Sequence, residues 1–307
     1  MNNLDRVAGS IPPLVTPFKK GEVDFDAYAG LVEFHVKNGS HGILVNGTTA
    51  EPSTLTTSER NRLVDVAIAT VNGRIPVVAA TGSQSLAETE QLTSHAVRCG
   101  VDALLVVTPY YISPPQRGLI EYYVTLADQH ETPWMIYHIP GRTAVSVTLD
   151  TLQAVKERSP HFVGMKHAVN DLGFVTEALA ALGDDFKVFV GLEALSFPMM
   201  AIGASGLMNA VGNLCPDVLA KMCNAVAEGD FVTGRAMHQQ LLEINQAVFF
   251  DTNPIPMKYM MKRLGLMPAN EHRLPMVPAM PELEKRLDGV LERAGLLTGE
   301  NVNRTIC

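Results

Sequence analysis

Short apolar segments alternate with longer amphipathic segments along the first two thirds of the chain. The apolar segments are three to six residues long and rich in Val, Ile, Leu and Ala. Runs this short are typical of strands that are buried on both faces of a sheet. We therefore expect strands at residues 11–15 (interrupted by two prolines), 43–45, 75–80, 103–107, 134–137, 162–165, 188–190 and 206–211.

The amphipathic segments carry residues that start and stop helices. Asp, Ser and Thr favour the position before a helix, where the side chain accepts a hydrogen bond from the backbone. A Glu three residues later completes a capping box, and a Gly suits the helix end. These signals predict helices from Asp24 to Asn38-Gly39, from Thr56 with Glu59 to Asn72-Gly73, and from Ser85 with Glu88 to Cys99-Gly100.

The spacing of the strands predicts the fold class. From the strand at 43–45 onwards, successive strands are 20 to 34 residues apart, enough for one crossover helix each. Eight strands that alternate with helices predict a (β/α)8 TIM barrel. A doubly wound sheet shows the same alternation, but the strand count favours the barrel and no GxGxxG fingerprint follows the first strand.

The strand signal stops after the eighth segment. Helical patterns dominate from Pro216 to Leu297, for example at residues 218–227 and 235–248. We expect three parts: a barrel with the active site at residues 1–215, a C-terminal helical domain at 216–297 and a polar tail at 298–307.

Composition and charge exclude several classes of protein. The 307 residues are 47% hydrophobic and 18% charged, which is too apolar for a disordered chain. The net charge of −8 argues against nucleic-acid binding, and no apolar run approaches the roughly 20 residues of a membrane span. The first 15 residues do not resemble a secretory signal, and the four cysteines form no CxxC pair. We expect a cytoplasmic protein.

Motifs for nucleotides, metals and serine hydrolysis are missing from the sequence. It contains no GxxxxGK[ST], HExxH or GxSxG motif, and the nine histidines show no spacing typical of metal ligands. We therefore expect neither a metal site nor a cofactor.

Lys166 directly follows the apolar segment 162–165. The carboxyl ends of the strands form the active-site face of such a barrel, so this amine is expected at its mouth. Burial disfavours the charged ammonium, and a neutral amine can form a Schiff base with a carbonyl substrate. The alternative is a structural lysine that reaches solvent or pairs with an acid.

Further polar residues follow other strands. The phenol of Tyr137 can move protons to and from a Schiff base, with the hydroxyl of Thr48 as a relay. Thr48 and Thr49 precede a helix start, where N–H groups and hydroxyls suit a substrate carboxylate. Arg142 can bind a second carboxylate through its planar guanidinium. The alternatives are packing for Tyr137, a plain turn for the threonines and a solvated loop for Arg142.

Five motifs together make the chain resemble the dihydrodipicolinate synthase / N-acetylneuraminate lyase family, which are class I pyruvate-dependent aldolases. The resemblance extends from about Gly9 to Leu297. The motifs are Gly47-Thr48-Thr49-Ala50-Glu51 (GxTGE in the family), Thr108-Pro109-Tyr110-Tyr111, Tyr137-x-x-Pro140, Gly164-Met165-Lys166 and Asn253-Pro254-Ile255-Pro256-Met257-Lys258.

The resemblance implies a Schiff-base mechanism in which Lys166 attacks the ketone of pyruvate. Thr49 and the backbone of its loop would hold the pyruvate carboxylate. The imine would become an enamine that attacks a small aldehyde. The other predicted substrate-binding residues, besides Arg142, are Gly47, Gly191 and Met208.

The same resemblance assigns the proton transfers to Tyr137 and Thr48, together with a tyrosine from a neighbouring subunit. Tyr111 stands at the matching position. This implies a homo-oligomer, usually a tetramer in this family.

Arg142 favours the synthase branch of the family, because the matching arginine there binds the carboxylate of aspartate semialdehyde. That branch makes the first committed intermediate of lysine biosynthesis. The alternative is a sister aldolase or dehydratase that acts on a 2-keto-3-deoxy sugar acid or another 2-oxo acid. A binding module that keeps the barrel without catalysis is disfavoured, since it would not need a buried amine.

Several departures from the synthase pattern support the alternative. Ala50 replaces the second glycine of GxTGE, and His167 stands where synthases commonly have glutamate. We expect these positions, and others that differ, to line the pocket and to affect the second substrate; the others are Pro52, Leu192-Glu193 and Ile112-Ser113. Because Pro52, Ser53 and Gln84 do not match the usual lysine contacts, weak or absent inhibition by lysine is expected.

Overall fold

Eight parallel strands form one sheet in the computed structural model, which describes residues 3–297. Their order around the sheet is β1-β10-β9-β8-β7-β6-β5-β4. Strands that are adjacent in the sheet are also consecutive among its strands in the sequence, except that the first strand, β1, pairs with the last, β10. The strands are β1 (Gly9–Ser10), β4 (Ile43–Val45), β5 (Val77–Ala80), β6 (Ala103–Val107), β7 (Trp134–His138), β8 (Phe162–His167), β9 (Lys187–Val190) and β10 (Gly206–Leu207).

Backbone contacts around Pro12 and Pro13 close this sheet into a barrel. Proline has no N–H group to donate to a strand ladder, which shortens the first strand. The neighbouring groups bond instead: Leu44 N–H donates to Pro12 C=O at 2.9 Å, and Leu14 N–H donates to Leu44 C=O at 3.0 Å. A parallel bridge between Pro13 and Leu44 joins β4 to the start of the chain. The predicted strand at 11–15 is therefore corrected to Gly9–Ser10, and the predicted (β/α)8 barrel is confirmed.

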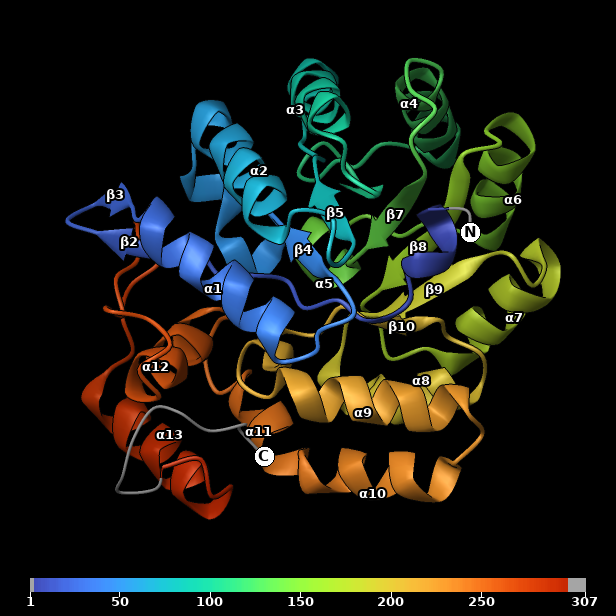
Figure 1. Cartoon of the computed structure of the whole chain (residues 1–307). Helices are drawn as coiled ribbons and strands as arrows, with labels where there is room; N and C mark the ends of the chain where they lie inside the picture. The colour runs from blue at the N-terminus through green and yellow to red at the C-terminus, as the bar shows by residue number, and fades with distance from the viewer. Residues whose placement is uncertain (1–2, 298–307) are drawn as a thin grey trace.

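Helices surround the strands as an outer ring (Figure 1). The predicted caps at Asp24, Thr56 and Ser85 are all present, and their side chains accept hydrogen bonds from the backbone three residues on. The α-helices between β1 and β10 are α1 (Phe25–Lys37), α2 (Thr57–Val71), α3 (Leu86–Cys99), α4 (Gln116–Ala127), α5 (Pro140–Thr143), α6 (Leu149–Arg158), α7 (Leu172–Leu182) and α8 (Ser196–Ala201).

One predicted capping box is incomplete. Ser85 accepts from the Glu88 N–H, but the Glu88 carboxylate does not bond back to the Ser85 backbone. It accepts instead from the hydroxyls of Ser83 and Thr57, which ties α3 to the end of β5 and to α2. The reciprocal bond is replaced because these hydroxyls reach the carboxylate.

Two apolar cores lie on the two faces of the barrel strands. The inner core fills the barrel and includes Leu44, Met135, Tyr137, Phe189 and Met208. The outer core packs the other face of the strands against the helices. Because alternate residues of a strand point to opposite faces, each strand feeds both cores, as its continuous apolar run predicts.

A helical segment follows β10, at the lower side of Figure 1. Within residues 3–297 no strand occurs after β10, as the sequence predicts. The predicted single pattern at 235–248 is broken at Leu241 into two helices. The segment consists of α9 (Pro216–Ala227), α10 (Phe231–Gln240), α11 (Leu242–Ala247), α12 (Ile255–Arg263) and α13 (Pro281–Arg293).

The domain division at 215/216 stays a prediction. Helix α9 packs against β1 at the barrel and also against α10 of the helical segment. The polar tail at 298–307 lies outside the described residues. None of the helices in residues 3–297 is long and apolar enough to span a membrane.

A small antiparallel hairpin precedes α1 and was not predicted. It pairs β2 (Phe18–Lys19) with β3 (Glu22–Val23). Two-residue strands carry too little periodicity to be recognised in a sequence.

Candidate active site

Tyr137 and Lys166 lie side by side at the carboxyl ends of β7 and β8. They are partners in the parallel register of these strands. Both are buried, and Tyr137 belongs to the core inside the barrel. The Lys166 Nζ lies 4.4 Å from the centre of the Tyr137 ring. The predicted amine and the predicted phenol are thus in contact.

Thr48 brings a hydroxyl to the same place from the loop after β4. Its Oγ1 donates to the Tyr137 hydroxyl oxygen at 3.3 Å, a weak hydrogen bond. Thr48 begins the short 3-10 helix Thr48–Ala50, which follows Gly47. The structure therefore joins Thr48, Tyr137 and Lys166 in one continuous set of contacts.

Thr49 is held by the C-terminal helical segment. The side-chain amide of Asn253 donates to the Thr49 Oγ1 at 3.0 Å, across 204 residues of sequence. An Nη2 of Arg142, an exposed residue on α5, donates to the backbone carbonyl of Asn253 at 3.2 Å. Asn253 therefore links the two groups that we predicted to bind carboxylates. Its role was missed, although it begins the Asn-Pro-Ile-Pro-Met-Lys motif.

Gly191, directly after β9, leaves room for the Lys166 side chain. A Cβ at this position would lie 3.1 Å from Lys166 Cε and 2.8 Å from Ala168 Cβ. Any side chain here would push the lysine stem or the backbone near it. Met208 is buried in the inner core of the barrel. Gly47 packs against Pro13 and Leu44, where a Cβ would lie 3.2 Å from Leu44 Cδ2.

Tyr111 lies apart from these residues. It is 93% exposed, and its backbone is in the left-handed region with φ of 75°. Within the described single chain it forms no hydrogen bond with Thr48 or Tyr137. Such exposure of a large aromatic side chain leaves it available to a partner surface.

Glu193 is a buried carboxyl near Lys166, and the sequence identifies it only as a difference from the usual synthase pattern. Its Oε1 accepts from the Ala210 N–H at 2.7 Å, and its Oε2 has no hydrogen-bond partner. Burial raises the pKa of Glu193, while backbone hydrogen bonds and the charge of Lys166 oppose that shift. The sequence signal for Glu193 is its position three residues after the end of the seventh predicted strand.

His167 points away from Lys166, which corrects our expectation that it lines the pocket. Adjacent residues of a strand face opposite sides, so the ring of His167 enters the outer core. It stacks on Phe174 of α7, and its Nδ1 lies 3.2 Å from the Nδ1 of His138. Burial lowers the pKa of both histidines to about 4.

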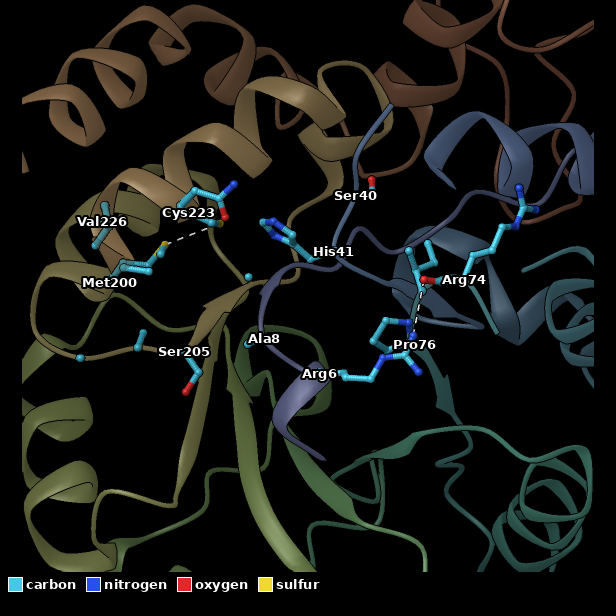
Figure 2. Close-up of a pocket in the computed structure, with 16 residues that line it drawn as sticks. Arg6, Ala8, Ser40, His41, Arg74, Pro76, Met200, Ser205, Cys223 and Val226 are labelled. Atoms are coloured by element: carbon cyan, nitrogen blue, oxygen red, sulfur yellow. Dashed lines mark hydrogen bonds between the residues drawn. The ribbon is translucent and has the colours of Figure 1, made fainter. Parts of the chain in front are cut away.

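Two other features, a cluster of side chains and a cavity, lie away from the carboxyl ends of the barrel strands. Within residues 3–297, the one group of three side chains that could hold a metal, Asp65, His95 and Cys99, is on α2 and α3. A cavity of about 670 Å³ opens at the amino-terminal end of the barrel, with His41 between Arg6 and Met200 (Figure 2). The cavity is separate from the predicted catalytic residues, because none of them lines it.

Sequence comparisons assign the chain to one family. Residues 6–294 match the sequence model of the dihydrodipicolinate synthetase family. A curated 4-hydroxy-tetrahydrodipicolinate synthase of Thermus thermophilus is 43% identical over 293 residues, which cover 95% of this chain and 98% of the relative.

Solved structures agree with the sequence comparison. A dihydrodipicolinate synthase from Aquifex aeolicus matches with a TM-score of 0.93 at 40% identity, covering 95% of this chain and 100% of the other. A chloride-inhibited dihydrodipicolinate synthase from Acinetobacter baumannii, solved in complex with pyruvate, matches with a TM-score of 0.92 at 33% identity. That alignment covers 95% of this chain and 100% of the other.

Proposed function

The chain belongs to the dihydrodipicolinate synthetase family, and from this membership we propose that it acts as a 4-hydroxy-tetrahydrodipicolinate synthase. The substrates are pyruvate and aspartate semialdehyde. The proposal is supported by the near-complete coverage of the relatives and by the buried lysine at the mouth of the barrel.

The contact between Lys166 and Tyr137 is the observation on which the proposed mechanism rests, because it places the nucleophile beside the proton carrier. The neutral amine of Lys166 attacks the ketone carbon of pyruvate, and loss of one water from the adduct gives an imine. Tyr137, with Thr48 hydrogen-bonded to its hydroxyl, gives and takes the protons of these steps. Loss of a proton from the methyl carbon then gives the enamine, which attacks the aldehyde carbon. The buried setting excludes water that would hydrolyse the imine early.

Two positions bind the carboxylates. Thr49 and the N–H groups of its loop hold the carboxylate of pyruvate. Arg142 binds the carboxylate of the semialdehyde, and its Nη2 contact with Asn253 orients the guanidinium while leaving other N–H groups free. An acceptor that has its own carboxylate is therefore preferred.

The presence of His167 where synthases commonly have glutamate does not favour the sister aldolase, because the His167 ring faces the outer core. Ala50 is likewise buried, and its carbonyl accepts from the Thr16 hydroxyl at 2.7 Å. The difference at His167 is therefore a packing difference, whereas Ala50 stays a difference within the carboxylate-binding loop. This weakens the case for a 2-keto-3-deoxy sugar acid.

The exposed Tyr111 supports a homo-oligomer, a tetramer in our proposal, in which this phenol enters the relay of a neighbouring subunit. We also propose a cytoplasmic location, which agrees with the free thiols of Cys99 and Cys223. Weak or absent inhibition by lysine stays a prediction.

A steady-state assay tests the proposed function. The protein is given pyruvate with aspartate semialdehyde, and separately a 2-keto-3-deoxy sugar acid for cleavage. We expect turnover only in the first assay, and Arg142→Gln should raise the KM for the semialdehyde more than that for pyruvate. Turnover only in the second assay would assign the chain to the sister activity. Adding lysine to the first assay tests feedback, and micromolar inhibition would contradict our prediction.

A further inference from the structure

Three side chains with different donor atoms meet on the outside of the barrel, between α2 and α3. Asp65 lies on α2, and His95 and Cys99 lie one turn apart on α3. The Asp65 Oδ1 is 2.7 Å from His95 Nε2 and 3.2 Å from Cys99 Sγ. All three donor atoms lie within 4.8 Å of one another. The two helices pack side by side, as Figure 1 shows.

The donor set selects a class of metal. One imidazole, one thiol and one carboxylate suit Zn²⁺ and its neighbours in the first transition row, whereas Mg²⁺ and Ca²⁺ require oxygen ligands. With the thiol ionised, the carboxylate and the thiolate balance the two positive charges of the ion. A bound zinc site would therefore carry no net charge.

The distances fit a tetrahedral ion after small side-chain rotations. Zinc bond lengths of about 2.0–2.3 Å place tetrahedral ligand atoms about 3.3–3.6 Å apart. The present 2.7 and 3.2 Å separations would open by less than an ångström, and the separation of His95 from Cys99, at most 4.8 Å, would close to about 3.6 Å. His95 and Cys99 are four residues apart on one helix, and such residues lie on the same face.

The group is open on its outer side. The Asp65 side chain is 52% exposed and that of His95 23% exposed. Solvent can therefore reach the ion and supply a fourth ligand. We propose that Asp65, His95 and Cys99 form a three-ligand site for Zn²⁺ or a similar divalent transition metal, which links α2 to α3.

Binding exchanges one proton for the metal. In the metal-free protein, the Cys99 thiol donates to Asp65. When the ion binds, the thiol proton leaves to solvent and the sulfur lone pair forms the bond to the metal. The Nε2 proton that bonds to Asp65 in the metal-free protein moves to Nδ1 through solvent, so the neutral imidazole binds the metal through the lone pair of Nε2. No oxidant or reductant is needed.

The site is structural and separate from the proposed reaction. Cys99 ends α3, four residues before β6 begins at Ala103. It therefore lies toward the amino-terminal end of the barrel, whereas Lys166 is at the carboxyl end of its strand. The sequence predicts no metal site, because its histidines show no spacing typical of metal ligands and Asp65 is 30 residues from His95.

Cobalt spectroscopy tests the proposal with the full chain. The protein is stripped with a chelator and titrated with Co²⁺, whose tetrahedral complexes absorb in the visible and whose thiolate bonds add a charge-transfer band. We expect one Co²⁺ per chain with both signals, displaced by Zn²⁺. Zn²⁺ should also raise the Tm of the stripped protein.

Variants assign the ligands. Cys99→Ser should abolish the charge-transfer band and the zinc-dependent rise in Tm, and His95→Gln should weaken binding at least tenfold. Cys307→Ser is the matched control and should keep both signals. If Cys99→Ser does not fold, protection of the Cys99 thiol from alkylation by Zn²⁺ in the wild-type protein, read by peptide mass spectrometry, takes its place. A wild-type protein without the band, or a band that survives in Cys99→Ser, overturns the proposal.

Discussion

Lys258 Nζ lies 2.8 Å from Glu51 Oε1, and the two side chains are 0% and 1% exposed. Glu51 ends the loop that carries Thr48 and Thr49, while Lys258 belongs to α12 of the C-terminal segment. His272 contacts the other carboxylate oxygen at 3.0 Å. The C-terminal segment thus holds the predicted carboxylate-binding loop in place.

Removing one partner of this ion pair should destabilise the protein. Lys258→Met leaves the Glu51 carboxylate buried with only His272 beside it, and we expect a loss of about 3–5 kcal/mol in the free energy of unfolding. Urea unfolding followed by circular dichroism measures the loss.

Two controls isolate the effect. The double variant Glu51→Gln with Lys258→Met should recover much of the stability, because no uncompensated charge is left. Lys262→Met, an exposed position on the same helix, should change the free energy by less than about 0.5 kcal/mol. Equal losses at Lys258 and Lys262 would show that the buried pair contributes nothing specific.

The hydroxyl of Tyr137 should matter for rate rather than for stability. Tyr137→Phe keeps the ring that contacts Lys166 but removes the proton carrier, so we expect kcat to fall about 10²–10⁴-fold. Thr48→Val should give a smaller fall, and Thr48→Ser, which keeps the hydroxyl, should be close to wild type. Steady-state kinetics of all three variants tests this relay. A Tyr137→Phe protein with unchanged kcat would remove it from the mechanism.

The buried pair of His138 and His167 predicts a loss of stability in acid. Burial lowers the pKa of each to about 4, against an ordinary value of 6.5. Between these pH values the unfolded chain binds more protons than the folded one, so stability falls as the pH decreases. The slope is at most about 1.4 kcal/mol per pH unit for each histidine.

Urea unfolding at several pH values from 7 to 4 measures this slope. His35 is also buried with a pKa lowered to about 4, so it adds to the wild-type slope. His167→Gln should make the slope shallower, because one titrating group is gone. A slope that is the same in this variant contradicts the assignment of the acid loss to the pair.

Tyr111 should act in the site of a neighbouring subunit. Tyr111→Phe and Lys166→Ala subunits are each expected to be almost inactive alone. In a hybrid pair, the Tyr111→Phe subunit keeps its lysine and receives Tyr111 from the other chain. Random mixing should restore about a quarter of the wild-type activity, because half of the pairs are hybrids with one complete site each. No recovery, although mass spectrometry shows exchanged subunits, would show that Tyr111 does not act in the site of the neighbouring subunit.

The sequence predicted the barrel and the position of Lys166 because both depend on local patterns. The apolar run before Lys166 marks a buried strand, and parallel strands bring their carboxyl ends to one face. That the strands of Tyr137 and Lys166 are neighbours follows from their order along the chain. The caps at Asp24, Thr56 and Ser85 were recognised because capping uses residues only three apart.

Other features depend on contacts that no local pattern contains. The bond of Asn253 to Thr49 spans 204 residues. Strand β8 extends to His167, two residues past the predicted end, so alternation places His167 on the side opposite Lys166. The first strand was misplaced because the bonds around Pro12 and Pro13 depend on Leu44. The partner of Tyr111 belongs to an assembly that one chain does not define.

Borohydride trapping of pyruvate tests the central assignment of Lys166 most directly. The protein is reduced in the presence of excess pyruvate, and the adduct is located by intact-mass and peptide mass spectrometry. Our account predicts one pyruvate-derived adduct per chain, on the peptide with Lys166, and none in Lys166→Ala. No adduct on the folded wild-type protein, or an adduct on another lysine, would contradict it.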